Sequence, residues 1–145
     1  MRARFSIEAL PLETLHEFRI SRVGSKTYEN LVFVAEVGDL VARGESAPRE
    51  FYGEDLPKAR EALAHFLEEA EDFPDLAERI VEAPDAKAAD RAIGDALARY
   101  DAVGRDPAGR TALDGCLYDL AGKALGVPLY RMLSLDPAKI GRAHV

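Results

Sequence analysis

The chain has 145 residues, of which 48% are apolar and 31% charged, and its formal net charge is -7 at pH 7. These values are typical of one globular domain with a core of ordinary size. The acidic balance argues against general nucleic-acid binding, because proteins that bind phosphate backbones present a basic face. The sequence shows neither a run of about 18 apolar residues, as a membrane span requires, nor an apolar stretch near Met1 like that of a signal peptide.

Cys116 is the single cysteine, so the chain cannot form an internal disulfide. It lies within a helical pattern of apolar residues, and we expect a small core side chain rather than a reactive thiol. With no sign of a signal peptide or membrane span, these features predict a reducing, cytoplasmic setting.

The first third of the chain predicts three strands. Residues 4–12 alternate apolar and polar side chains, and Pro11 marks either the end of this strand or an edge position. Residues 31–37 are rich in β-branched and apolar types, and a Gly-Asp dipeptide then predicts a two-residue hairpin turn into residues 40–46. We therefore expect a three-stranded antiparallel meander with one apolar face that helices must cover.

The remainder of the chain predicts helices. Asp55 is suited to cap a helix with Pro57 in its first turn. Gly126 followed by Pro128 is a typical helix stop. The order β-β-β-α-α-α-α makes the predicted fold class α+β. Apolar residues recur at helical spacing within four segments, at 56–70, 76–81, 86–100 and 111–124.

Two segments between these elements carry side chains suited to binding. Residues 18–27, between the first two predicted strands, are interpreted as a loop too long for a tight hairpin, with three cations and small hydroxyl residues. Residues 44–54, which leave the third strand, carry the adjacent aromatics Phe51 and Tyr52. Cationic and aromatic loop residues suit carboxylate-bearing small molecules. Plain connecting loops are the alternative.

A search for catalytic motifs is negative. The sequence has no phosphate-binding loop, dinucleotide fingerprint, nucleophile elbow or zinc-binding helix. Its carboxylates are scattered over helix faces, so no acid–base pair stands out, and the acidic run at residues 68–72 is interpreted as a solvated helix end. We therefore expect no catalytic and no metal-ligating residue in this chain.

Five segments resemble a known family. Residues 111–133 resemble the helix that closes the N-terminal domain of the enolase superfamily, of the mandelate racemase/muconate lactonizing enzyme type. The resemblance extends over nearly all of residues 2–138. The other four segments are similar to those of the dipeptide epimerase branch, which includes the L-Ala-D/L-Glu epimerases: Phe18-Arg-Ile-Ser-Arg22, Glu29-Asn-Leu-Val-Phe33, Gly44-Glu-Ser-Ala-Pro48 and Tyr52-Gly-Glu54.

The sequence motifs are more specific for the superfamily than for the dipeptide epimerase branch. Cys116-Leu-Tyr-Asp119 stands where Ala-Leu-Trp-Asp is more usual, and Leu133-Ser-Leu135 stands where Leu-Gly-Gly is frequent. The second departure weakens assignment to the lactonising branch more than to the epimerases. Two alternatives stay open: the lid of a muconate-cycloisomerase-like or o-succinylbenzoate-synthase-like enzyme, and a free-standing α+β module that binds an acidic small molecule.

The resemblance implies an isomerase whose catalytic barrel follows this domain. In that family a barrel lysine removes the proton alpha to a substrate carboxylate, Mg²⁺ held by three barrel carboxylates stabilises the enediolate, and a second lysine reprotonates it. None of these groups has a counterpart here. The domain would cap the barrel, with Arg19 and Arg22 contacting a substrate carboxylate such as that of a dipeptide, and Phe51 and Tyr52 walling the pocket. Lys123 would be structural, and a homo-oligomeric parent is compatible with the resemblance.

The chain ends twelve residues after Leu133. The resemblance therefore implies a capping domain at residues 2–133, the start of the connection to a missing barrel at residues 134–139, and a fragment that is inactive alone. Residues 140–145, Ile-Gly-Arg-Ala-His-Val, match the translation of a short-read sequencing adapter, and we interpret them as read-through. A genuine basic tail is the alternative.

Overall fold

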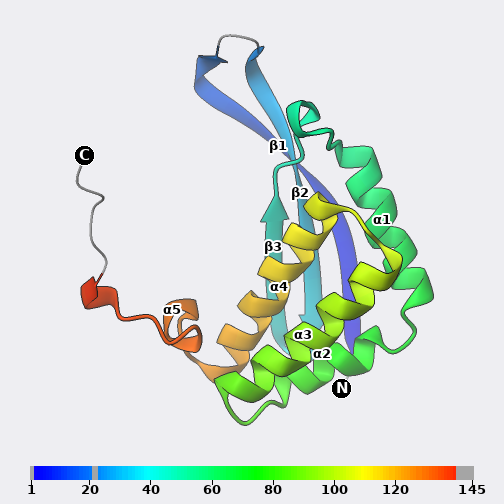
Figure 1. Ribbon diagram of the computed structural model, residues 1–145, viewed down its shortest axis with the longest axis vertical. Helices are drawn as coiled ribbons and strands as arrows, with labels where there is room; N and C mark the ends of the chain where they lie inside the picture. Colours follow the sequence, from blue (N-terminus) through cyan, green and yellow to red (C-terminus); the bar gives the residue numbers. More distant parts are fainter. Residues whose placement is uncertain (1, 21–22, 140–145) are drawn as a thin grey trace.

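The computed structural model describes residues 2–20 and 23–139, and the expected read-through at residues 140–145 lies outside them. The three strands form one antiparallel sheet in the order β1-β2-β3, and helices cover one of its faces (Figure 1). The predicted α+β class, a meander followed by four main helices, is confirmed. The elements are β1 Ala3–Ile20, β2 Val23–Val37, β3 Leu40–Ser46, η1 Glu50–Tyr52, α1 Leu56–Glu69, α2 Phe73–Val81, α3 Ala86–Val103, α4 Pro107–Leu125, α5 Leu129–Met132 and η2 Pro137–Lys139.

The first two strands are longer than the sequence pattern predicts. β1 continues through Pro11 as far as Ile20, and β2 begins at Val23, so the predicted loop at residues 18–27 is wrong for the residues that the structure describes there, which are strand. Of the two alternatives for Pro11, the edge position is confirmed, because β1 is an outer strand of the sheet. An outer strand tolerates a residue that lacks a backbone N–H.

An irregularity in β1 explains why the alternation of side chains does not predict the full length of the two strands. Between Glu13 and Phe18 the register shifts. Glu13 pairs with Thr27 and Phe18 with Ser25, so an advance of five residues along β1 matches an advance of only two along β2. Extra residues of this kind break the alternation of side chains and increase the local twist. The arm, defined here as residues 13–20 with residues 23–27, extends beyond the rest of the sheet (Figure 1).

The core lies between the inner face of the sheet and the helices. Alternate residues of β2 from Leu31 to Val37 are fully buried on this face. The Phe66 ring of α1 lies 4.8 Å from Phe73 of α2 and 5.3 Å from Tyr100 of α3, both in edge-to-face geometry. Such aromatic pairs stabilise beyond their buried area, and this cluster joins three helices in one core.

Local signals in the sequence begin and end the helices. The predicted cap at Asp55 is confirmed, and Asp85 and Asp106 act in the same way: each of the three accepts a hydrogen bond from the backbone N–H three residues onward, which satisfies a donor that the helix leaves unpaired. The predicted stop of α4 is confirmed, because Gly126 has a left-handed φ of 65°. The turn between β2 and β3 likewise uses Gly38, with a φ of 59°.

Helix α4 and strand β3 approach each other so closely that one contact admits only glycine. A Cβ atom on Gly44 would lie 2.0 Å from the carbonyl oxygen of Ala112 and 2.2 Å from the backbone nitrogen of Cys116. Cys116 itself is fully buried, and burial raises the pKa of its thiol to about 12. The predicted role of this cysteine as a small core residue is confirmed.

Replacing Gly44 by alanine is expected to lower the free energy of unfolding by about 3 kcal/mol, because the clashing atoms belong to the backbone and cannot rotate away. Gly94→Ala is the matched control, since Gly94 is exposed on α3 and its added Cβ meets nothing within 4 Å. That variant is expected to gain about 0.5–1 kcal/mol from helix propensity. Urea unfolding of both variants measures the difference, and equal stabilities would contradict the close-approach argument.

Candidate functional site

The predicted binding residues belong to two elements at one end of the molecule. Arg19 lies near the tip of the arm, where its backbone pairs with Gly24. Phe51 and Tyr52 lie in η1, the short turn between β3 and α1. Figure 1 shows the arm and η1 at the same end of the sheet. Arg22 lies outside the described residues, so its predicted contact with a substrate stays a prediction.

Phe51 and Tyr52 form an exposed aromatic pair. Their exposed fractions are 66% and 74%, and their ring centroids lie 5.2 Å apart in edge-to-face geometry. The turn closes at Gly53, whose left-handed φ of 74° lets its N–H donate to the carbonyl oxygen of Glu50. Two large rings held outward on a short turn are available to contact a ligand or another part of a larger protein.

A polar network anchors this turn to the sheet. The guanidinium of Arg49 lies 4.9 Å from the Tyr28 ring centroid, and its nitrogens donate to the carbonyl oxygen of Pro48 at 2.9 Å and to Oδ1 of Asn30 at 3.1 Å. Nδ2 of Asn30 donates to Oε1 of Glu45 at 2.6 Å. Asn30 is only 7% exposed, so its amide needs these partners.

This network is not predicted from the sequence. Arg49 lies inside a segment singled out for its aromatic residues, and a cation next to them was the available signal. Asn30 lies between Glu29 and Leu31, and nothing in this local sequence indicates its partners, because only the pairing of β2 with β3 brings it near Glu45.

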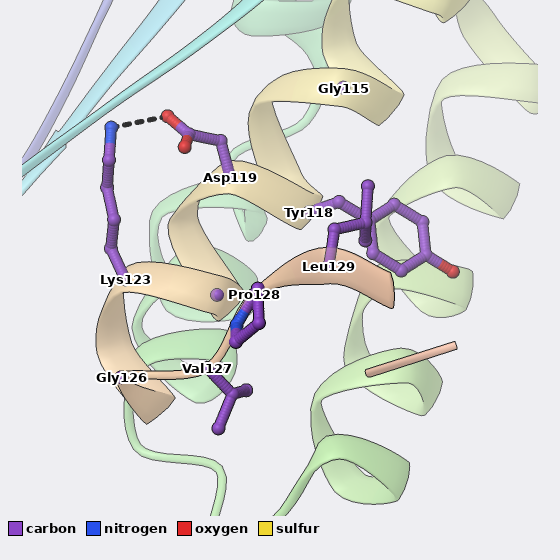
Figure 2. Close-up of a pocket in the computed structure, with 9 residues that line it drawn as sticks. Gly115, Tyr118, Asp119, Lys123, Gly126, Val127, Pro128 and Leu129 are labelled. Atoms are coloured by element: carbon purple, nitrogen blue, oxygen red, sulfur yellow. Dashed lines mark hydrogen bonds and ion pairs between the residues drawn. The ribbon is translucent and has the colours of Figure 1, made fainter. Parts of the chain in front are cut away.

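A shallow groove of about 330 Å³ lies at the other end of α4, where the helix meets α5 (Figure 2). In Figure 2, Asp119 and Lys123 point toward one another, and Tyr118 lies beside Leu129. Neither Phe51 nor Tyr52 lines this groove. Its walls are formed by Gly115, Tyr118, Asp119, Gly122, Lys123, Gly126, Val127, Pro128 and Leu129.

Asp119 and Lys123 bond to the outer edge of β3. Nζ of Lys123 donates to Oδ2 of Asp119 at 2.6 Å and to the carbonyl oxygen of Val41 at 2.8 Å. The same Oδ2 accepts from the backbone N–H of Arg43 at 2.9 Å. The two side chains thus take the place of a neighbouring strand, and they cover an edge that would otherwise invite pairing with another chain. This arrangement agrees with the structural role expected for Lys123.

Tyr118 is also engaged in a structural bond. Its hydroxyl donates to Oδ1 of Asp90 on α3 at 2.6 Å. That hydrogen bond, together with burial, raises the pKa of Tyr118 to about 12. The phenol therefore stays protonated near neutral pH and does not serve as a base. One turn earlier, burial raises the pKa of the Asp114 carboxyl.

The described side chains do not form a ligand set for the magnesium ion that the resemblance implies. In residues 2–20 and 23–139, no three His, Cys, Asp or Glu side chains come together in a way that could hold a metal ion. In the same part of the chain, no helix has the length and apolar character needed to cross a membrane. The described surface presents an exposed aromatic pair on η1, whereas Tyr118, Asp119 and Lys123 beside the groove make structural bonds.

Solved structures share this fold. The dipeptide epimerase from Methylococcus capsulatus, solved with Mg and L-Arg-D-Lys, matches 99% of this chain at 25% identity (TM-score 0.68), and the match covers 36% of that chain. The dipeptide epimerase from Enterococcus faecalis V583, solved with Mg and L-Leu-L-Tyr, matches 92% at 23% identity (TM-score 0.67, 34% of that chain). A mandelate racemase/muconate lactonizing protein from Herpetosiphon aurantiacus matches 84% at 18% identity (TM-score 0.58, 31% of that chain). No protein-family model and no curated protein matches the chain.

The chain therefore has the fold of the N-terminal domain of the enolase superfamily, and the resemblance predicted from the sequence is confirmed. Within that superfamily, these structural neighbours are dipeptide epimerases and mandelate racemase/muconate lactonizing proteins. The chain spans about a third of the length of the solved structures that it matches.

Replacing Asp119 by alanine is expected to lower the free energy of unfolding by about 1–3 kcal/mol, because the Arg43 N–H loses its acceptor and the Lys123 ammonium keeps only the carbonyl oxygen of Val41. Asp95→Ala is the control, since Asp95 makes a surface ion pair with Arg79 at 3.0 Å. Exposed pairs contribute about 0–1 kcal/mol. Chemical unfolding of the two variants separates these cases, and equal losses would argue against the edge contact.

Proposed function

We propose that the chain is the N-terminal capping domain of a magnesium-dependent dipeptide epimerase, an isomerase that removes and returns a proton alpha to a carboxylate. The observation that carries this proposal is the match of 99% of this chain to 36% of a dipeptide epimerase chain solved with Mg and a dipeptide. The rest of such a protein would supply the barrel, which carries the metal ligands and the bases. This domain would be inactive alone.

The arrangement of the predicted binding residues supports a capping role. Loops that a rigid scaffold holds at one end are a common place for substrate contacts. Phe51 and Tyr52 would form an apolar wall over the substrate, and Arg19 and Arg22 would contact its carboxylate. Closure of these elements over a barrel mouth would exclude water and help to select the substrate.

Exposed apolar side chains favour a capping domain over a free-standing module. Along β1, Leu15 is 93% exposed, and after α5 Leu135 is 58% exposed. Leu10 and Leu12 on β1, and Leu129, Tyr130 and Leu133 in and directly after α5, are also exposed. Large apolar patches on soluble domains mark surfaces that contact another protein part. We propose that the barrel covers them.

Three further proposals concern the parent protein: an alternative class of enzyme, a cytoplasmic setting and a homo-oligomeric state. A mandelate racemase/muconate lactonizing protein is among the structural matches, so the lid of a cycloisomerase-like or o-succinylbenzoate-synthase-like enzyme is the second candidate.

The buried, free thiol of Cys116 is in keeping with a cytoplasmic parent. We further propose that the parent is a homo-oligomer, which its hydrodynamic mass would test.

The intact gene tests the proposed function directly. Genomic DNA beyond the codon for Ala138 is expected to encode a barrel, with Lys-x-Lys on its second strand and three spaced acidic residues on later strands. The purified product is expected to exchange the α-proton of dipeptides with solvent deuterium in the presence of Mg²⁺, and chelation should abolish the exchange.

Other outcomes distinguish the candidates. Turnover of a muconate-type substrate without dipeptide exchange would favour the cycloisomerase alternative. A natural stop codon after Val145, or a continuation that encodes no barrel, would refute the capping-domain proposal.

In the intact enzyme, Arg22→Ala is expected to raise KM for the dipeptide about tenfold with a smaller fall in kcat, because a charge-assisted hydrogen bond to the substrate is lost. Arg91→Ala is the control, since Arg91 is exposed on α3 in the helical layer. Steady-state kinetics give KM and kcat for the two variants. An unchanged KM in Arg22→Ala would refute the binding role of Arg22.

A further inference from the structure

We propose that Arg49 is a positioning residue, which locks η1 and its aromatic pair against the base of the arm, so that the two binding elements keep one fixed arrangement. The expected effect of Arg49 on substrate binding by an intact enzyme rests on the proposed function. The structural lock itself concerns this chain alone and is tested on it.

The first contact of the lock is with the base of the arm. Tyr28 pairs with Leu12, and the next pair, Glu13 with Thr27, is the last before the register shift. The guanidinium of Arg49 lies 4.9 Å from the Tyr28 ring centroid, within the range of a cation–π interaction. The contact therefore reaches the hairpin within one residue pair of the point where the ladder becomes irregular.

The second contact is with the body of the sheet. The Arg49 side chain donates to Asn30 on β2, and Asn30 in turn donates to Glu45 on β3. Asn30 is almost completely buried, so its position is set by the two strands. A side chain bonded to a buried amide has little freedom to swing away.

The main chain of the same residue holds the turn. The carbonyl oxygen of Arg49 accepts the backbone N–H of Tyr52 at 2.9 Å and that of Glu54 at 3.2 Å. One residue thus fixes η1 through its backbone and binds the hairpin and the sheet through its side chain. Because Phe51 and Tyr52 lie within this turn, their position follows from that of Arg49.

The described contacts require arginine rather than any cation. A planar guanidinium can stack on a ring and donate in two directions at once, whereas a lysine ammonium is a point charge on a flexible stem. The three described partners of the guanidinium are a ring, an amide oxygen and a carbonyl oxygen, all of them neutral. Geometry, more than charge, therefore defines the lock.

Hydrogen exchange of this chain, followed by NMR, tests the structural part. In Arg49→Met, the amide protons of Tyr52, Gly53 and Glu54 are expected to exchange at least about tenfold faster, while amides in the middle of α1 keep their rates. Arg43→Met removes an exposed cation from β3 and is expected to leave all of these rates unchanged. Wild-type exchange of the three amides in Arg49→Met would overturn the proposal.

A second pair of variants covers the case in which Arg49→Met does not fold. Tyr28→Phe keeps a ring under the guanidinium and should exchange as wild type, whereas Tyr28→Leu removes the ring and should loosen the same three amides. Equal exchange in these two variants would overturn the lock.

Kinetics of the intact gene product test the consequence for catalysis. Arg49→Met is expected to raise KM for the dipeptide about fivefold with kcat changed less than about twofold, because substrate-facing elements are misplaced while the chemistry is not. Arg49→Lys should show the same defect. A KM restored by lysine, or unchanged in Arg49→Met, would overturn the positioning role. If the wild-type protein lacks epimerase activity, the proposed function fails, and the exchange rates alone decide the lock.

Discussion

The contact between α4 and β3 is the constraint on which the rest of the structure depends. Gly44 brings the two backbones so close that an added Cβ would lie 2.0 Å from a carbonyl oxygen of the helix. Further along the same helix, Asp119 and Lys123 bond to the outer edge of the strand. Since both contacts involve backbone atoms of β3, the strand has no freedom to slide on the helix.

The position of β3 determines the position of the binding elements. The strand ends at Ser46, and η1 begins at Glu50, so the aromatic turn starts only a few residues from a fixed point. The Arg49 network then joins the turn to the hairpin. A rigid body of sheet and helices thus presents exposed side chains at one end, which is the arrangement that a capping domain needs.

The two ends of α4 differ in kind. At one end lie the arm and η1, and η1 carries the exposed rings of Phe51 and Tyr52. At the other end lies the groove beside α5, where the side chains of Tyr118, Asp119 and Lys123 make structural bonds (Figures 1 and 2). Under the proposed function, the end with the arm and η1 would face the substrate, while the barrel would supply the chemistry. This division agrees with the fold shared with much longer enzymes.

Signals that act over a few residues were sufficient to predict the meander, the turn at Gly38, the cap at Asp55 and the stop at Gly126, because each depends on backbone geometry that its own residue type favours. The family resemblance, carried by short motifs in order, was likewise available from the sequence alone. The length of β1 was not, because the register shift after Glu13 depends on how two strands pair. The partners of Arg49 and Asn30, and the glycine contact of α4 with β3, were decided only by tertiary structure, since they join residues that the chain brings together across strands and layers.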